Sequence, residues 1–278
     1  MRPDSPRLDA ELLLAFVLDC PRLDLYLRAD QPLNEKERGA YRELVQQRAA
    51  GCPIAYLTGE KEFWSLTLEV NKNTLIPRPD TETLVEIAVE QIRKRQNNHP
   101  DSKCLIAELG TGTGAIPLAI CAELKNLHII AVDCTEDVLQ VAARNLQRHK
   151  SLLSPRNNHI ELVESNLFSK INPAAKLDCI ISNPPYIPRS EKSMMAAHVI
   201  AYEPDLALFV EDHHPLIFYD AIAKYALKSL KKKGKLYFEI HEDFADKIKT
   251  LLNHLGFEGV VIHHDLNKKA RMASAIRA

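Results

Sequence analysis

Apolar side chains recur at helical spacing through the first part of the chain. Ser5-Pro6 is typical of a helix start, with a serine cap and a proline at the first helical position. An apolar stripe then follows at helical spacing: Leu8, Leu12, Ala15 and Phe16. Asn34 and Glu37 predict a capping box, which opens a second helix that Gly51 and Pro53 end. These helices form too small a unit for a core of their own, so we expect them to lean on the rest of the chain.

The hydrophobic period changes after this helical segment. Apolar residues alternate through Leu66, Leu68 and Val70, which is the pattern of a strand. The pair at residues 75–76 is expected to return as its partner, so that residues 63–76 form a short hairpin between two domains. Asp80 is then the expected N-cap of the next helix.

From residue 103 onward, apolar strand-like runs alternate with helical patterns. The predicted strands are residues 104–109, 128–133, 160–163, 177–182, 235–240, 260–263 and 272–276. Nearly continuous apolar strands between helices are typical of a parallel sheet covered on both faces. The patterns therefore divide the chain into a helical domain (1–62), a hairpin linker (63–79) and an α/β domain (80–278).

Composition narrows the function only slightly. The 278 residues carry a formal net charge of −1, with 36 basic and 37 acidic side chains. Proteins that bind long stretches of nucleic acid usually carry an excess of basic side chains, and this chain does not. Nucleic acid is therefore not expected as a direct partner. No stretch reaches the ~18 apolar residues of a membrane span, and no secretory or transit pattern is visible, so we expect a cytoplasmic protein.

The cysteines and histidines give no reason to expect a metal. None of the six cysteines forms a C-x-x-C pair, and Cys104, Cys121 and Cys179 lie in apolar runs where a thiol acts as a core residue. The histidine pairs at 213–214 and 263–264 have no partners at ligand spacing. The lysine run at 231–235 is expected to follow a helix end and face water, with an RNA or ribosome contact as the alternative.

A glycine-rich turn follows the first predicted strand of the α/β domain. The candidate cofactor residues in this turn are Glu108, Gly110, Thr111, Gly112, Thr113 and Gly114. Glycines there permit a tight turn and let backbone N–H groups approach a ligand closely. The second strand ends at Asp133, 23 residues after Gly110, where a carboxylate can accept hydrogen bonds from both hydroxyls of a ribose. NAD and S-adenosylmethionine both carry such a ribose, so these residues predict only a cofactor of the adenosine type.

The fourth strand breaks into Asn183-Pro184-Pro185-Tyr186, which is the candidate catalytic loop. Ligands of open α/β sheets bind at the carboxyl ends of the strands, so the loop, and Asn183 in particular, should face the cofactor. The two prolines stiffen it and aim its carbonyl groups. The Asn183 side-chain oxygen and the Pro184 carbonyl can together accept both hydrogens of an –NH2 group, and Tyr186 offers a flat face for a planar amide or base.

This loop suits methyl transfer to a planar amide nitrogen, which is a poor nucleophile because its lone pair is delocalised. Two acceptors hold both protons, raise the electron density on nitrogen and aim its lone pair. No strong base is required, because the methylated, protonated amide is very acidic and loses its proton. This chemistry favours S-adenosylmethionine over NAD.

These residues resemble the glutamine N5-methyltransferases that modify peptide chain release factors (the PrmC/HemK family). The resemblance spans nearly the whole chain and is carried by residues 53–59 (PIAYLTG), 63–64 (FW), 75–82 (LIPRPDTE), 110–114, 183–186 (NPPY) and 202–204 (YEP). It implies a small helical domain that docks the release factor, before a Rossmann-like class I methyltransferase domain with a seven-stranded sheet whose last strand is antiparallel. By position, residues 110–114 and Asp133 would bind S-adenosylmethionine. We expect the protein to be a monomer. The loop at 183–186 would hold the glutamine of a Gly-Gly-Gln motif.

Two positions depart from the family pattern. The helical domain begins abruptly at Met1, where members usually carry another helix; either the start codon is misplaced or the domain is trimmed. After the third strand, members usually carry an acidic residue near the adenine and then a bulky apolar one. Asn166 and Leu167 occupy those positions and are the expected adenine contacts.

Other functions fit the sequence less well. A glutamine methyltransferase of a ribosomal protein is the nearest alternative, and residues 78–82 favour release factors over it. A DNA amino-methyltransferase could use the same loop on a flipped base, but neither charge nor a spare domain supplies a DNA-binding surface. A nicotinamide oxidoreductase would need a hydride-transfer site, and no residues in the sequence resemble one. A non-catalytic RNA-binding module would leave residues 183–186 unexplained.

Overall fold

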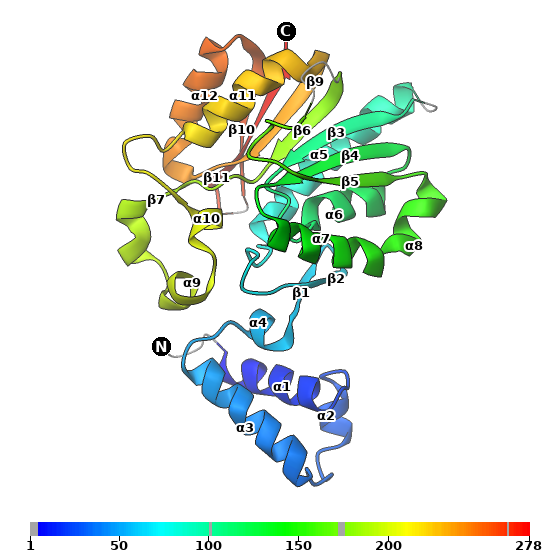
Figure 1. Cartoon of the computed structure of the whole chain (residues 1–278), viewed down its shortest axis with the longest axis vertical. Helices are drawn as coiled ribbons and strands as arrows, with labels where there is room; N and C mark the ends of the chain where they lie inside the picture. The colour runs from blue at the N-terminus through cyan, green and yellow to red at the C-terminus, as the bar shows by residue number, and fades with distance from the viewer. Residues whose placement is uncertain (1–4, 100–101, 172–175, 266) are drawn as a thin grey trace.

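The computed structural model describes residues 5–99, 102–171, 176–265 and 267–278. Its first part is a helical unit, which lies apart from the sheet in Figure 1. The unit comprises α1 (Pro6–Val17), α2 (Asp24–Leu27), α3 (Glu35–Ala49) and α4 (Ile54–Thr58). The predicted capping box is confirmed, because Asn34 Oδ1 accepts from the Glu37 N–H at 2.9 Å and Glu37 accepts from the Asn34 N–H at 2.8 Å.

The apolar stripe predicted for α1 is only partly correct. Leu8 and Phe16 are 39% and 49% exposed, whereas Leu13, which the stripe leaves out, is buried together with Ala15. Helical spacing identified the helix but not the side that packs, because α1 meets both α3 and α4.

A hairpin joins the helical unit to the rest of the chain. It pairs β1 (Glu60–Phe63) with β2 (Leu66–Glu69) in antiparallel register. The partner of the predicted strand therefore precedes it, and the expected return at residues 75–76 is wrong. Trp64 and Ser65 make the turn with positive φ angles of 52° and 58°. Asp80 is likewise not a cap, since α5 (Asp80–Asn98) has Pro79 at that position.

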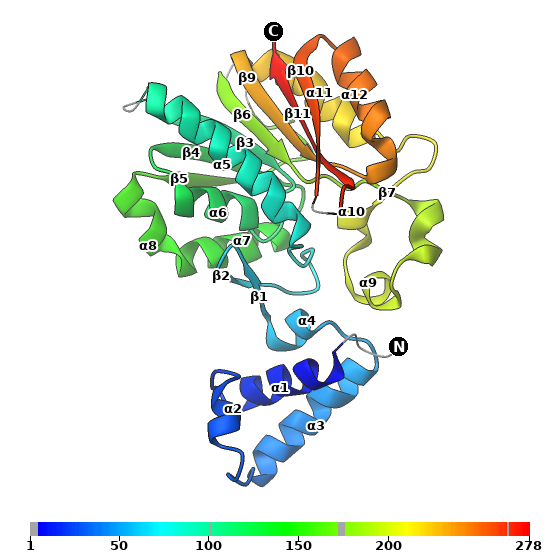
Figure 2. The ribbon, with the colours of Figure 1, turned by 180° about the vertical axis from the view of Figure 1, so that it is seen from behind.

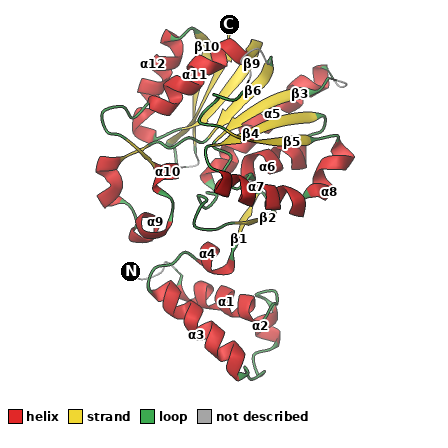
Figure 3. Ribbon diagram, in the orientation of Figure 1, coloured by secondary structure: helices red, strands yellow, loops and turns green. Residues whose placement is uncertain are grey.

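The α/β domain is built on a seven-stranded sheet with the order β10-β11-β9-β6-β3-β4-β5 (Figure 3). Its strands are β3 (Cys104–Leu109), β4 (Leu127–Asp133), β5 (His159–Glu164), β6 (Leu177–Ser182), β9 (Leu230–Glu239), β10 (Phe257–His264) and β11 (Ala270–Arg277). The last strand runs antiparallel between β9 and β10, and the other neighbours pair in parallel. The predicted Rossmann-like methyltransferase fold with an antiparallel last strand is therefore confirmed.

Helices cover both faces of this sheet. One face carries α5, α6 (Ala115–Glu123) and α7 (Glu136–Arg148), and Figure 2 brings α5 to the viewer's side. The opposite face carries α11 (Ile217–Ser229) and α12 (Ala245–His254). The buried side chains form two clusters, one under each layer, and Phe63 and Leu68 of the hairpin belong to the first.

The remaining short elements lie in connections. They are α8 (Lys150–Leu153), β7 (Ile187–Pro188), α9 (Ala197–Tyr202), α10 (Asp205–Leu208), β8 (Phe209–Val210) and the 3-10 turns at Ser154–Arg156, Arg189–Met194 and Glu242–Phe244. Within the described residues, no helix has the length and hydrophobicity that a membrane crossing requires.

Candidate active site

The carboxyl ends of three neighbouring strands bring the predicted site residues to one edge of the sheet. Leu109 at the end of β3 pairs with Val132 of β4 on one side and with Ser182 of β6 on the other. The glycine turn that follows Leu109 therefore lies between Asp133 and Asn183. The structure thus brings together the three groups that the sequence predicted to meet.

The glycine turn adopts a backbone that side chains would disturb. Gly110, Gly112 and Gly114 have φ angles of +73°, +55° and +78°, a region that glycine occupies readily. A Cβ on Gly110 would lie 3.6 Å from the backbone oxygen of Asn183, so the turn and the catalytic loop are direct neighbours.

Asn145 of α7 ties this turn to the hairpin. Its Nδ2 donates to the Thr113 carbonyl at 2.9 Å and to the Glu69 carbonyl at 3.0 Å, while its Oδ1 accepts from the Glu69 N–H at 2.6 Å. The side chain is fully buried. This residue was not predicted from the sequence, where its signal is a polar side chain among the apolar positions of an amphipathic helix.

Asp133 lies directly against the glycine turn. Its Oδ2 accepts from the Gly112 N–H at 2.9 Å and its Oδ1 from the Cys134 N–H at 2.8 Å. Burial raises the pKa of the Asp133 carboxyl, and these hydrogen bonds oppose that shift. The carboxylate thus holds the turn and remains at the strand tip where a ribose would bind.

Glu108 is buried one residue before the end of β3. Its side chain is 1% exposed, and neither carboxylate oxygen has a partner at full hydrogen-bonding geometry. The Thr111 hydroxyl, which also lacks such a partner, lies close enough to lower the pKa of the carboxyl group in part. Burial raises the pKa of Glu108 to about 8. Buried polar atoms are nearly always satisfied in native proteins, so unpaired oxygens beside a glycine turn fit a site that is completed by a polar or cationic ligand.

The candidate catalytic loop is anchored by a buried carboxylate that was not predicted from the sequence. Asn183 Nδ2 lies 3.2 Å from Thr81 Oγ1, and Thr81 Oγ1 lies 2.7 Å from Glu239 Oε2. The Tyr186 hydroxyl lies 3.1 Å from the other Glu239 oxygen. Burial, followed by the Glu239 charge, raises the pKa of Tyr186 far above its usual range, so the hydroxyl keeps its proton. The visible signal for Glu239 was an acidic residue inside an apolar strand.

A cavity of about 270 Å³ opens beside this loop. Its lining includes Arg78, Asn183, Tyr186, Met195, Val199 and Leu208. Arg78 pairs with Glu203 at 2.5 Å, and the Glu203 side chain is completely buried. Glu203 also accepts from the Ile76 N–H at 3.2 Å, which fixes the segment before α5 against the segment around α9 and α10. The cavity is thus lined both by apolar side chains and by Asn183 and Tyr186 of the candidate catalytic loop.

Asn166 and Leu167 reach the same sheet edge but show no adenine-specific feature. Asp133 pairs with Glu164, so Asn166 follows the strand next to the one that ends at Asp133. The Asn166 side chain is exposed, and Leu167 is half-buried with a φ of +52°. Their role in adenine binding stays a prediction.

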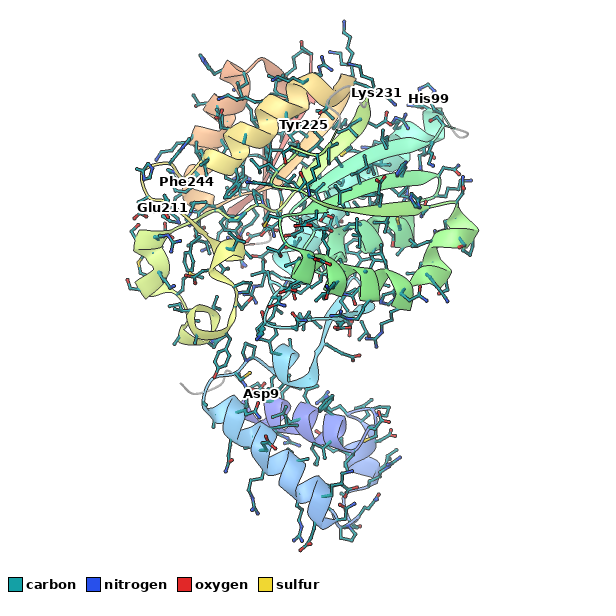
Figure 4. The ribbon with its side chains drawn as sticks, viewed as in Figure 1. Asp9, His99, Glu211, Tyr225, Lys231 and Phe244 are labelled. Atoms are coloured by element: carbon teal, nitrogen blue, oxygen red, sulfur yellow. The ribbon has the colours of Figure 1, made fainter. Side chains whose placement is uncertain are left out.

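A larger cavity of about 370 Å³ lies at the opposite edge of the sheet, where β6 begins. Figure 4 labels Lys231 and His99, which line it, far from Asp9 of the helical unit. Asp178 Oδ1 pairs there with Arg95 at 2.9 Å and Lys231 at 2.8 Å. The lysine run follows the end of α11, and Lys232 and Lys233 are exposed, as predicted. The run also lies in β9, however, and Lys231 pairs with Asp178, which the sequence did not predict.

Among the described residues, one group has the geometry of a metal site: Glu191, His241 and Asp243, with potential ligand atoms within 4.8 Å of one another. Hydrogen bonds already occupy both ring nitrogens of His241. Nδ1 accepts from the Asp243 N–H at 3.2 Å, and Nε2 lies 3.1 Å from Glu191 Oε2. These bonds account for the cluster, and we assign it no metal.

Comparison with known proteins first defines the class. Residues 86–208 match the family model of the methyltransferase small domain, and residues 2–59 match that of the PrmC N-terminal domain. A methyltransferase structure from Pyrococcus furiosus superposes with a TM-score of 0.53 at 17% identity, covering 85% of this chain and 98% of that one. The human methyltransferase 10 domain containing protein gives 0.54 at 18%, with 85% and 99% covered. At such identities these structures show the shared fold alone.

Curated relatives then define the family. The release factor glutamine methyltransferase of Leptospira interrogans is 37% identical, with 98% of this chain and 92% of that protein covered. The protein of the same description from Chlorobaculum tepidum is 36% identical, with 98% and 91% covered. The chain belongs to the release factor glutamine methyltransferase family. The bifunctional methyltransferase of Rickettsia prowazekii is 38% identical over 96% of this chain, which spans about half (52%) of that relative's length.

Proposed function

We propose that this protein transfers a methyl group from S-adenosylmethionine to the side-chain amide nitrogen of a glutamine in peptide chain release factors. The observation that carries the proposal is the position of Asn183. It lies against the glycine turn on one side and lines the acceptor cavity on the other, with its amide nitrogen already engaged by Thr81. Its oxygen is therefore available for an N–H group of an acceptor.

The chain's residues fit S-adenosylmethionine as the methyl donor. When bound, this cofactor supplies an electrophilic methyl group on a sulfonium. Asp133 would accept hydrogen bonds from the ribose hydroxyls, and the backbone of the glycine turn would lie against the ligand. Glu108 would accept from the ammonium of the methionine part, which would satisfy the two buried oxygens that lack partners. A positive ligand also favours the ionised form of this carboxyl group.

The acceptor amide would be held by the loop at residues 183–186. Asn183 Oδ1 and the Pro184 carbonyl accept its two N–H hydrogens, and the Tyr186 ring supports its plane. These acceptors raise the electron density on the nitrogen and direct its lone pair, which is the costly part of the reaction. The proton leaves the methylated amide to water without a dedicated base.

The relatives' description as release factor glutamine methyltransferases supports release factors as the protein substrate. The substrate glutamine is then that of the Gly-Gly-Gln motif of the release factor. We assign the binding of the release factor to the helical domain at residues 1–62. The hairpin linker (63–79) and the methyltransferase domain (80–278) complete this division, with the hairpin itself beginning at Glu60.

The test is methylation of a purified release factor with cofactor labelled in its methyl group. We expect one methyl group on the Gly-Gly-Gln glutamine by mass spectrometry. A release factor with that glutamine replaced by alanine is the matched control and should stay unlabelled. Labelling of the control, of a ribosomal protein alone or of DNA alone would overturn the proposal.

A further inference from the structure

The Asn183 carboxamide lies at the end of a hydrogen-bonded chain that starts on a buried carboxylate. Glu239, the last residue of β9, is 2% exposed, and Thr81 in the first turn of α5 is 6% exposed. Glu239 Oε2 contacts the Thr81 hydroxyl at 2.7 Å, and that hydroxyl contacts Asn183 Nδ2 at 3.2 Å. Three segments far apart in the sequence thus converge on one side chain of the acceptor site.

This series of hydrogen bonds has a fixed donor-to-acceptor direction, because its first member, the Glu239 carboxylate, can only accept hydrogen bonds. Burial raises the pKa of Glu239, and the hydrogen bonds from Thr81 and Tyr186 oppose that shift. Each carboxylate oxygen faces a hydroxyl group, as the ionised form requires. An ionised carboxylate offers no hydrogen, so the single hydrogen of the Thr81 hydroxyl is directed to Glu239. Thr81 Oγ1 then has only lone pairs left for Asn183, which must present its –NH2 group. An inverted carboxamide would place two acceptors face to face. The carboxylate therefore determines which end of the Asn183 amide is left for the acceptor.

We propose that Thr81 and Glu239 are positioning residues, which hold the Asn183 carboxamide with its oxygen toward the acceptor amide. The proposal rests on the proposed function, because this orientation is required only if the group that receives the methyl donates an N–H hydrogen bond to Asn183. Glu239 also accepts from the Tyr186 hydroxyl at 3.1 Å, so a single carboxylate orients the hydrogen-bonding residue and the stacking residue of the loop.

The cost of burying Glu239 supports a role beyond packing. Within the described part of the chain its carboxylate forms no ion pair, and its two oxygens accept from the Thr81 and Tyr186 hydroxyls. The charge of Arg271 lowers the pKa of Glu239, but Arg271 pairs with Asp80 and Asp265 instead. A buried carboxylate without a cation is expensive, and a neutral glutamine would fill the same volume. Glutamine differs from the carboxylate because its –NH2 group can donate a hydrogen bond to Thr81. The series of hydrogen bonds would then no longer have a fixed direction.

Steady-state kinetics of substituted full-length proteins test this assignment. Thr81→Val removes the hydroxyl, and Glu239→Gln lets residue 239 donate to Thr81 so that Asn183 can invert. We expect kcat on release factor to fall about 10- to 100-fold in each, the size of one reversed buried hydrogen bond, with KM for the cofactor unchanged. Thr81→Ser keeps the hydroxyl and should restore kcat to near the parent value.

Thr74→Val is the matched control, since Thr74 is a buried threonine whose hydroxyl, among the described residues, hydrogen-bonds only with the backbone of the nearby Asn71. It should leave kcat unchanged. Equal kcat in Thr81→Val and the parent protein would overturn the assignment. So would a Thr81→Ser protein as slow as Thr81→Val, because the hydroxyl would then not be the relevant group.

Hydrogen exchange of the Asn183 side-chain amide, followed by nitrogen-15 NMR without cofactor or acceptor, separates this inference from the proposed function. The two Nδ2 hydrogens should exchange slowly in the parent protein and in Thr81→Ser, and faster in Thr81→Val. If the parent labels no release factor while this pattern holds, the proposed function fails and the orientation stands. Equal exchange in all three proteins would overturn the orientation itself.

Discussion

The helical unit and the α/β domain are held together by different kinds of contact. In the helical unit, α1 buries Leu13 and Ala15, and α3 buries no side chain completely. Polar contacts join its segments instead: Arg48 of α3 pairs with Asp9 of α1 at 2.7 Å, and Glu11 of α1 accepts from Tyr26 of α2 and from Arg22 just before α2. In the α/β domain, two apolar clusters fill both faces of the sheet.

This difference matches the work that each region is proposed to do. Methyl transfer needs acceptors held to within fractions of an ångström, and the dense domain provides Asn183 with a support of buried partners. The helical unit exposes Leu23, Tyr26 and Leu27 at 68%, 53% and 85%. Apolar groups left on a thinly packed unit suit contact with a protein partner, where their burial is gained on binding.

The sharpest test of the comparison is to damage the chemistry without damaging the fold. Asn183→Ala removes the oxygen that is proposed to accept from the reacting amide, while the glycine turn and Asp133 remain. We expect kcat to fall by about 10²- to 10³-fold, as when one donor or acceptor of a preorganised site is lost. Cofactor affinity, measured by calorimetry, should change little. A cofactor defect as large as the kcat defect would contradict the assignment of Asn183 to the acceptor.

A core substitution in the helical unit should separate the two regions. Leu13→Ala removes a side chain that is 1% exposed and should cost about 2–4 kcal/mol of stability. Hydrogen exchange should show faster opening of α1 and α3 with β3 and β6 still protected. Leu8→Ala, at an exposed position on the same helix, is the control and should cost far less. Uniform loss of protection throughout the chain would mean that the regions unfold as one unit.

The buried carboxyl group of Glu108 should make the stability of the α/β domain, and not that of the helical unit, depend on pH. Its pKa is about 8 when folded against an ordinary value of 4.5, because burial penalises the charged form. The folded state therefore holds the proton more tightly, so stability is fully present below about pH 4.5 and falls as pH rises toward 8. The slope reaches at most about 1.4 kcal/mol per pH unit.

Urea unfolding at several pH values between those limits measures this slope. Glu108→Gln cannot titrate and should show a flatter profile, with its largest advantage at the upper end. If the substituted and parent proteins keep the same slope, the carboxyl group of Glu108 does not titrate abnormally.

Asp133→Ala should produce a smaller, localised defect. It removes the expected ribose acceptor and also frees the Gly112 N–H that Asp133 holds at 2.9 Å. We expect cofactor binding to weaken by about 1–3 kcal/mol, the range for lost hydrogen bonds to a charged acceptor. Asp133→Asn keeps the shape without the charge and should lie between alanine and the parent. Unchanged calorimetric affinity in the alanine protein would remove Asp133 from the cofactor site.

Sequence alone predicted the sheet far better than the contacts across it. The strands expected at 104–109 and 177–182 match β3 and β6 to the residue, because continuous apolar runs bounded by turns are a local signal. The pairing of the hairpin was wrong, since alternation marks a strand but does not say which neighbour it meets. β9 begins five residues before the expected 235, because the lysines that open it are not apolar.

The same limit applies to the site. Gly110, Asp133 and Asn183 could be predicted to meet because strand order alone brings their positions to one edge. Thr81 and Glu239 could not, since their contact joins positions 158 residues apart. Such pairs depend on how α5 crosses the sheet, which no local pattern records. The support of a catalytic side chain is thus harder to foresee than the side chain itself.

The smallest expected effect concerns the adenine end of the cofactor site. Asn166 follows β5 beside Asp133, and its exposed amide oxygen can accept from the adenine amino group without charge assistance. An aspartate would make the same bond with a full negative charge, and charge-assisted bonds are roughly twice as strong. Leu167 would still cover one face of the ring. Asn166→Asp should therefore tighten S-adenosylmethionine binding by about 0.5–1.5 kcal/mol, the net value of one improved hydrogen bond.

Titration of both proteins with the cofactor at one pH and one salt concentration decides the matter. The expected gain is confined to adenine-bearing ligands, so adenosine should gain as much as the whole cofactor, whereas methionine should gain nothing. Asn166→Ala supplies the opposite change and should weaken adenosine binding. If all three proteins bind adenosine equally, the backbone reads the adenine and Asn166 faces solvent. The α/β domain would then recognise this end of its cofactor through the backbone and the shape of the site, without a contribution from the Asn166 side chain.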